Sequence, residues 1–97
     1  MAEMNSEVRH NAERSRYELF VDGVLVGFAD YRLRGDEVVI PHTEIERARR
    51  GQGLGAELVR GTLDELRRLG RTVVPQCWFV AEFIDEHPDY QALLRTG

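Results

Sequence analysis

The sequence has few of the residues that build cross-linked or membrane-embedded proteins. Its single cysteine, Cys77, excludes an internal disulfide bond and any cysteine-rich metal site. No run approaches the ~20 consecutive apolar residues of a membrane-spanning helix, and the polar residues 1–15 do not resemble a secretion signal. These absences predict a cytoplasmic protein that has no metal ion and no membrane partner.

Basic residues are outnumbered by acidic ones. The 97 residues contain 13 Lys and Arg against 17 Asp and Glu, a formal net charge of -4, which argues against a nucleic-acid partner. The basic residues gather instead at 47–50 and 67–71, where positive charge can serve an anionic cofactor. With 42% hydrophobic residues, the chain has apolar material for one core only. We predict a disordered N-terminus over residues 1–7 and a single domain over residues 8–97.

Alternating apolar residues, helical periodicity and turn residues outline an antiparallel meander followed by a β-α-β unit. Residues 8–11 could form a short edge strand or no element. The crossover of the β-α-β unit is expected to be right-handed, with its two strands parallel. The predicted elements are strands over 16–21, 24–33 and 37–45, a helix over 54–69, a strand over 71–79, a helix over 80–86 and a last helical turn over 89–94.

Three arginines lead into a glycine-rich turn before the long helix, in the order Arg47-Ala48-Arg49-Arg50-Gly51-Gln52-Gly53-Leu54-Gly55-Ala56. The first N–H groups of a helix lack intrahelical partners and lie at the positive end of the helix dipole, so they can bind an anion. Glycine keeps side chains away from these groups, and arginine can reach phosphate oxygens. The turn therefore predicts a pyrophosphate site. The alternative is an ordinary turn beside solvated arginines.

Two common nucleotide-binding motifs do not account for this turn. Gly51-x-Gly53-x-x-Ala56 formally fits the Rossmann fingerprint, but a short buried parallel strand does not precede it. No carboxylate stands near residues 74–76, where one would be needed to hold a ribose. The sequence G-x-x-x-x-G-K-[ST] does not occur, which excludes a P-loop.

Pro41 interrupts the third predicted strand and removes one backbone donor, so an irregularity is expected near His42. A strand released from its neighbour leaves N–H groups free to bind a ligand. Strand alternation places His42 and Glu44 on one face and Thr43 and Ile45 on the other, unless a bulge shifts the register. Only one of these faces is expected to meet the substrate.

Four short motifs of the sequence resemble those of a known family. Arg50-x-x-Gly53-x-Gly55 matches the Q/R-x-x-G-x-G/A signature of the GCN5-related N-acetyltransferases (GNATs). Three more motifs accompany it, so that residues 8–95 resemble the small acetyltransferase-like subfamily that includes the YjdJ-type proteins. The resemblance implies an α+β, GNAT-like fold with α/β/α sandwich-like layers. The additional motifs are His42-Thr43-Glu44-Ile45, Val74-Pro75-x-Cys77 and His87-Pro88-x-Tyr90.

The resemblance also implies acetyl-CoA or coenzyme A as the cofactor. The bulged strand would pair with the pantetheine arm, and the glycine turn would bind the pyrophosphate. His87 has the alternative role of helix terminator. The residues implied in cofactor binding are Thr43, Ile45, Arg49, Arg50, Gly51, Gln52, Gly53, Leu54, Gly55, Ala56 and His87.

Four side chains are candidates for the chemistry that the resemblance implies. Glu44 is the leading general base, with a surface ion pair as the alternative, and His42 could share its task or be structural. Cys77 could carry the acetyl group, line the pocket or fill the core, and no neighbour in sequence would lower the pKa of its thiol. Tyr90 could protonate the departing thiolate or serve packing. Trp78 departs from the proline that the subfamily leads us to expect after this cysteine.

The predicted function is an acetyl-CoA-dependent N-acetyltransferase that acts on an amine in an open groove. The acceptor would be a protein lysine, a protein N-terminus or a small amine, because the chain lacks most of the helical region with which larger GNATs enclose their acceptors. The alternatives are a CoA-binding module with little or no catalysis and an α+β interaction domain without a cofactor. Exposed sheet edges allow a monomer or a weak dimer.

Overall fold

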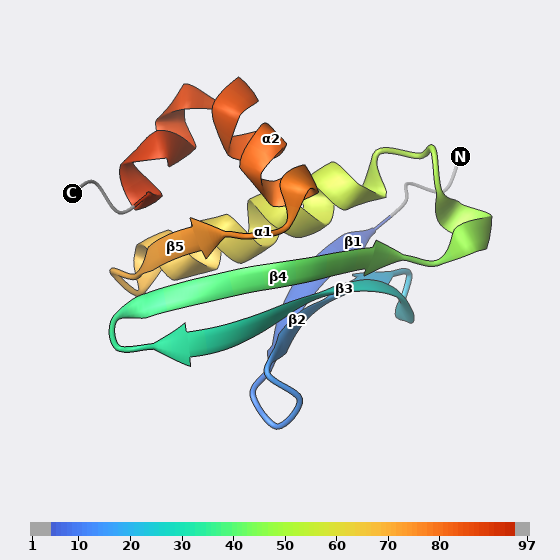
Figure 1. Ribbon diagram of the computed structural model, residues 1–97. Helices are drawn as coiled ribbons and strands as arrows, with labels where there is room; N and C mark the ends of the chain where they lie inside the picture. Colours follow the sequence, from blue (N-terminus) through green and yellow to red (C-terminus); the bar gives the residue numbers. More distant parts are fainter. Residues whose placement is uncertain (1–4, 95–97) are drawn as a thin grey trace.

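The structure is a computed structural model that describes residues 5–94, and the expectations for residues 1–4 and 95–97 lie outside this range. Five strands form one sheet in the order β1-β2-β3-β4-β5, and only the β4–β5 pair is parallel (Figure 1). Short 3₁₀ helices are labelled η. The elements are β1 (Ser6–Asn11), β2 (Arg16–Val21), β3 (Val24–Arg34), β4 (Glu37–Ile45), η1 (Arg47–Arg49), α1 (Leu54–Arg68), β5 (Thr72–Pro75), α2 (Trp78–Glu86) and η2 (Pro88–Leu93).

The predicted α+β class, the meander and the β-α-β unit are confirmed, with two corrections to their limits. Ser6 and Glu7 belong to β1, so the prediction of disorder is wrong for the end of the 1–7 segment. β5 ends at Pro75, well before residue 79, because proline has no N–H with which to continue a ladder. Beyond it, the Cys77 N–H donates to the Ile40 carbonyl oxygen at 2.9 Å, and α2 begins at the next residue.

Local sequence accounts for the turns that close these elements. Asp22 and Gly23 both have positive φ, 49° and 82°, as a two-residue hairpin turn requires. Gly70, with φ 71°, follows the end of α1. Its N–H donates to the Arg67 carbonyl oxygen, and the Arg71 N–H donates to the Leu66 carbonyl oxygen. This double pattern is a Schellman motif.

Both α-helices lie on the same face of the sheet (Figure 1). The molecule therefore has two layers there, and the expectation of α/β/α sandwich-like layers is wrong. The short connection over residues 12–15 explains this, because no helix between β1 and β2 can cross to the second face. The main core between sheet and helices contains Tyr17, Leu19, Val21, Val26, Ala29, Val38, Ile40, Leu54, Leu58, Val59, Leu63, Leu66, Val73, Cys77, Val80, Phe83, Ile84, Tyr90 and Leu93.

Two arginines of the helix-free face of the sheet lie over aromatic rings. The Arg9 guanidinium lies 4.3 Å from the centre of the Phe20 ring, and that of Arg16 lies 4.5 Å from the Phe28 ring. The Arg9 side chain is about half exposed, whereas that of Arg16 is largely buried and its Nε donates to Glu18 Oε2 at 2.7 Å. Within residues 5–94, no helix is both long and apolar enough to cross a membrane.

Candidate active site

A cleft of about 840 Å³ lies where β4 and β5 separate, beside the start of α1. The two strands pair only from Glu37 opposite Thr72 to Ile40 opposite Pro75, whereas β4 continues to Ile45. The end of β4 thus has no β5 partner on that edge. The cleft is lined by Pro41, His42, Thr43, Glu44, Ile45, Arg49, Arg50, Gly51, Gly53, Leu54, Gly55, Ala56, Leu58, Gln76, Cys77, Trp78 and Phe79.

A β-bulge in β4 marks the point of separation. Ile40 and Pro41 together lie opposite Tyr31 of β3, which confirms the irregularity predicted near His42. Proline suits this position because a bulged residue leaves the ladder. Gly27 then brings β3 close to the end of β4, since a Cβ atom at that position would stand only 2.7 Å from the carbonyl oxygen of Glu44.

The bulge also decides which backbone groups face the cleft. Glu46 donates its N–H to the Val26 carbonyl oxygen of β3 at 2.7 Å. Because successive N–H groups of a strand point to opposite edges, those of Ile45 and Thr43 point away from β3, toward the edge that β5 has left. The cleft therefore offers main-chain donors along an unpaired strand edge.

The side chains at the end of β4 project to both faces of the sheet. On the helix-free face, His42 Nε2 lies 3.7 Å from Glu44 Oε1, and both side chains are about half exposed. On the helix face, Thr43 Oγ1 lies 3.4 Å from Cys77 Sγ. Residues of both faces line the cleft because it opens at the free edge of the strand, and the expectation that only one face meets the substrate stays a prediction.

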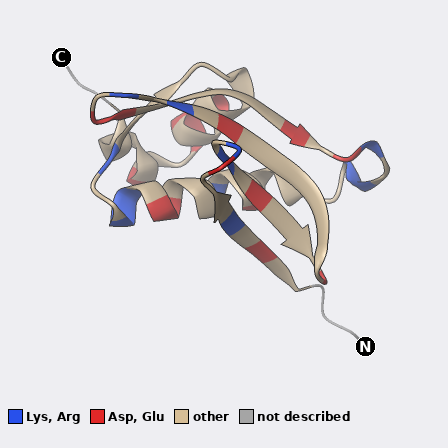
Figure 2. Cartoon of the chain, turned by 90° about the horizontal axis from the view of Figure 1, so that it is seen from below, with Lys and Arg blue, Asp and Glu red and all other residues tan. Residues whose placement is uncertain are grey.

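The turn before α1 has the geometry of an anion cradle, the name used for it below. Gly51 and Gly53 have φ values of 84° and 77°, and the space where their Cβ atoms would stand is empty to 4 Å. Gly53 is the N-cap of α1 and supplies no side-chain cap, so the first N–H groups of the helix are not occupied by a capping side chain. Arg49 and Arg50 line the same wall, and Figure 2 shows the arginine-rich turn in blue beyond the end of β4. This donor set fits the pyrophosphate of coenzyme A.

Gly55 has a different task from the other two glycines. A Cβ atom at this position would stand 2.8 Å from Cζ of Phe79, so its absence lets α2 pack on the first turn of α1. Arg50 fixes the other side of the cradle, where its Nε donates to the Ile45 carbonyl oxygen at 3.2 Å. Packing thus joins the cradle to both walls of the cleft.

Cys77 is the N-cap residue of α2 and is buried beside Thr43. Burial raises the pKa of its thiol, but the Thr43 hydroxyl and the backbone N–H groups of Val80, Phe79 and Thr43 favour the thiolate, so the net pKa is lowered. The sulfur makes no side-chain capping hydrogen bond. The N–H groups lower the pKa because they favour the negatively charged thiolate. The prediction that no neighbour in sequence would lower this pKa is therefore wrong for Phe79 and Val80, whereas the Thr43 groups come from β4.

We expect folded Cys77 to be alkylated by iodoacetamide at a lower pH than an unstructured thiol, whose pKa is about 8.5. The sign follows from the lowered pKa, which gives more thiolate at a given pH. Thr43→Val should move the midpoint of the rate upward, because it removes the hydroxyl. The measurement is the alkylation rate against pH for native and urea-unfolded protein.

Thr62→Val is the matched control, since the Thr62 hydroxyl is also buried but donates to Leu58 within α1. It should leave the midpoint unchanged. Equal midpoints for native and unfolded protein would contradict the assignment. The sequence has no other cysteine to confuse the readout.

Three predicted site residues are not brought to the cleft. Tyr90 is buried on η2 and donates to Asp64 Oδ1 at 2.6 Å, and burial together with this bond raises the pKa of its hydroxyl. His87 is the C-cap residue of α2, and its ring stacks on Phe83 with ring centres 4.0 Å apart. Both point elsewhere because the break at Pro88 turns the chain back onto α1. Gln52 is exposed and does not line the cleft.

Several residues of the cleft wall were not among the predicted site residues. Trp78 is 73% exposed at the start of α2, and its ring meets Phe79 edge-on with centres 5.9 Å apart. The tryptophan at a position where proline was expected was the feature of the sequence that could have indicated its place in the cleft wall. Gln76 accepts a hydrogen bond from Arg32 Nη2 at 3.3 Å, across the helix-free face.

Comparisons with known proteins agree with this geometry. A family model described as GCN5-related N-acetyl-transferase matches residues 16–93. Protein NATD1 of Bos taurus is 29% identical over 94 residues, which cover 91% of this chain and 80% of the bovine protein. Protein NATD1 of Homo sapiens is 28% identical with the same two coverages.

Two solved structures resemble the fold. The NMR structure of a GCN5-like putative N-acetyltransferase from Staphylococcus aureus has a TM-score of 0.70 at 18% identity, and the match covers 94% of this chain and 89% of that one. The ribosomal-protein-S18-alanine N-acetyltransferase from Escherichia coli has a TM-score of 0.57 at 24% identity, with coverages of 62% and 39%. These likenesses show the fold, and the family model spans most of the sequence. The chain therefore belongs to the GCN5-related N-acetyltransferase family.

Proposed function

We propose that this chain is an acetyl-CoA-dependent N-acetyltransferase that moves an acetyl group to an amine. The observation that carries the proposal is one cleft in which an anion cradle, an unpaired strand edge and a carboxylate lie together. The cradle suits the pyrophosphate of the cofactor. The N–H groups of Ile45 and Thr43 suit its pantetheine arm, which would pair with β4 as an added strand, although the Thr43 N–H also acts on the Cys77 sulfur.

When bound, acetyl-CoA supplies an acetyl group that is activated as a thioester. The chain's own contribution is then to orient the acceptor and to remove its proton. Glu44 is the carboxylate at the mouth of the cleft, and His42 lies 3.7 Å from it, so either can accept the proton and pass it toward solvent. The main-chain donors of β4 are also available to negative charge that develops on a carbonyl oxygen.

The open face of the sheet defines the side from which the acceptor approaches. Both α-helices lie on the opposite face, so Glu44 and His42 are reached without passing a lid. Exposed Trp78 forms the adjoining wall of the cleft. Such a mouth accepts a lysine side chain or the N-terminus of another protein as readily as a small amine.

Ligand-induced stabilisation tests the proposal first. At ~100 times its Kd, a ligand should add about 2.7 kcal/mol to the free energy of unfolding, which raises the thermal midpoint of such a small domain by about 10 °C or more. Acetyl-CoA and CoA should produce this shift, whereas ATP should not. Transfer is then measured by mass spectrometry on a panel of amines and lysine peptides.

The composition of the chain makes the mass-spectrometric measurement of acetyl transfer easier to interpret. All 13 Lys and Arg residues are arginines, so no lysine of the protein itself can be acetylated. An acetyl group that appears on the chain and is removed by hydroxylamine therefore marks Cys77 as its thioester carrier. Binding without transfer to any amine would point instead to a CoA-binding module, and no shift with acetyl-CoA or CoA would overturn both assignments.

A further inference from the structure

The outer edge of β1 carries unpaired backbone groups. Among residues 5–94, β1 pairs only with β2. The Asp22 N–H donates to the Asn5 carbonyl oxygen, so by alternation the backbone groups of Glu7 and Arg9 also face β2. Those of Ser6, Val8 and His10 then face outward, where another strand can bind them.

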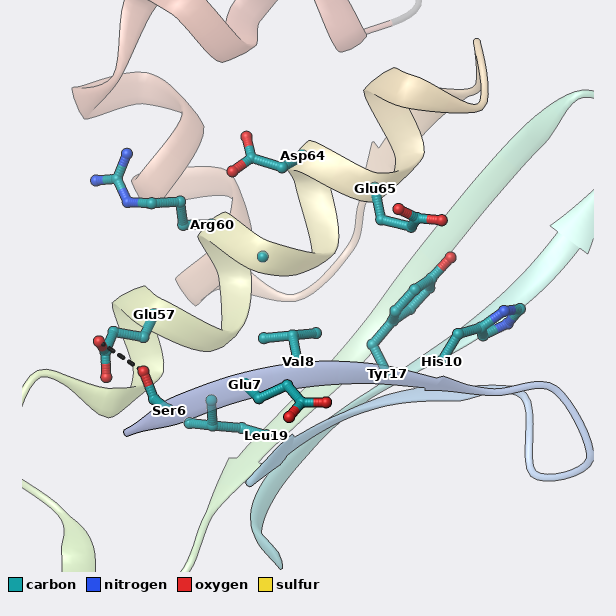
Figure 3. Close-up of a pocket in the computed structure, with 11 residues that line it drawn as sticks. Ser6, Glu7, Val8, His10, Tyr17, Leu19, Glu57, Arg60, Asp64 and Glu65 are labelled. Atoms are coloured by element: carbon teal, nitrogen blue, oxygen red, sulfur yellow. Dashed lines mark hydrogen bonds between the residues drawn. The ribbon is translucent and has the colours of Figure 1, made fainter. Parts of the chain in front are cut away.

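The helix side of this edge is open as well. A groove of about 490 Å³ runs between β1 and α1 (Figure 3). Ser6 and Val8 project from β1 toward the helix, and Ser6 Oγ donates to Glu57 Oε1 at 3.0 Å. The side chains of an added strand would therefore find space beside α1.

We propose that the strand added to this edge is β1 of a second copy of the chain, antiparallel and related by a two-fold axis that passes midway between the two copies of Val8. Facing side chains must lie on the same face of the sheet, so one residue has to face its own copy across the axis. With Val8 at the centre, Glu7 lies opposite Arg9 of the second copy, and Arg9 lies opposite its Glu7. The segment Glu7-Val8-Arg9 is thus complementary in charge to itself.

The hydrogen-bonding pattern selects the same register. Val8 faces outward, so two Val8 residues would form a hydrogen-bonded pair, flanked by pairs of Ser6 with His10. Glu7 and Arg9 would then occupy non-hydrogen-bonded pairs, in which facing side chains lie closest. An axis midway between the two copies of Glu7 or of Arg9 would oppose two like charges, which is destabilising.

The charges at this edge are accessible to a partner. The side chains of Arg9 and Glu7 are 53% and 56% exposed and form an ion pair of 2.7 Å within the chain. In the dimer each guanidinium would lie between two carboxylates. The clefts, at the β4–β5 ends of the two sheets, would remain separate, so this inference does not depend on the proposed acetyl transfer.

Charge exchange provides the test. The full chain should show a concentration-dependent dimer in sedimentation equilibrium up to ~1 mM, the range of a weak association. Glu7→Arg alone and Arg9→Glu alone should each abolish it, because each opposes like charges in both pairs. A mixture of these two variants should form a heterodimer, since every cross-strand pair then has opposite charges.

The mixture tests the ion pairs between chains separately from the ion pair within one chain. Each single variant has already lost the Glu7–Arg9 ion pair within its own chain. Asp36→Arg, an equal charge change in the exposed β3–β4 turn, is the control and should leave dimerisation intact. Circular dichroism checks that each variant is folded. A protein that stays monomeric to ~1 mM, or a dimer unaffected by both single variants, would overturn the proposal.

Discussion

Replacing Glu44 with glutamine is expected to lower the rate of acetyl transfer by about 10²–10⁴-fold, the usual range for loss of a general base. Glutamine keeps the shape of the side chain but cannot accept the proton of the attacking amine. The affinity for CoA should stay close to that of the unaltered protein, because Glu44 belongs neither to the glycine turn nor to the start of α1. The measurements are kcat with a fixed amine and the Kd for CoA by calorimetry.

Glu46→Gln is the matched control for this prediction. Glu46 follows β4 directly and is exposed, but it does not line the cleft. Its replacement should change kcat little, whereas His42→Asn should have an intermediate effect if the imidazole passes the proton on. Equal turnover in the Glu44 and Glu46 variants would remove Glu44 from the role of base.

Removing the arginines of the cradle should have the second large effect. Arg49→Ala and Arg50→Ala are each expected to weaken CoA binding by roughly 10–100-fold, because a hydrogen bond to a charged group contributes about 1.5–3 kcal/mol. Both side chains line the cleft, and Arg50 also ties the turn to the Ile45 carbonyl oxygen. The loss should be smaller at high salt, where the Debye length falls to about 3 Å.

Arg47 offers a control within the same turn. It is exposed and does not line the cleft, so Arg47→Ala removes the same charge a few residues away. We expect a change of only a few-fold in the Kd for CoA, measured by calorimetry at two salt concentrations. If all three single variants behaved alike, the arginines would act through net charge alone and the cradle would hold no specific contact.

Features that depend on neighbouring residues could be predicted from the sequence. The Asp22-Gly23 turn, the end of α1 at Gly70 and the bulge at Pro41 follow from the φ values and donors of those residues. The cradle was also predictable, because glycines before a helix leave its first N–H groups open. These properties belong to a few consecutive residues and change little with the rest of the fold.

Features that depend on distant residues could not be predicted in this way. Thr43, 34 residues away, contributes to the lowered pKa of Cys77, and Tyr90 donates to Asp64, 26 residues away. Only the path of the chain between such pairs decides whether they meet. Both helices lie on one face of the sheet, and residues from both faces of β4 line the cleft. These two features also depend on the tertiary structure, since they follow from where α2 packs and where β5 leaves the sheet. The sequence by itself determined the elements, the bulge and the open glycine turn through local backbone preferences, whereas the tertiary structure decided which reactive side chains share the cleft.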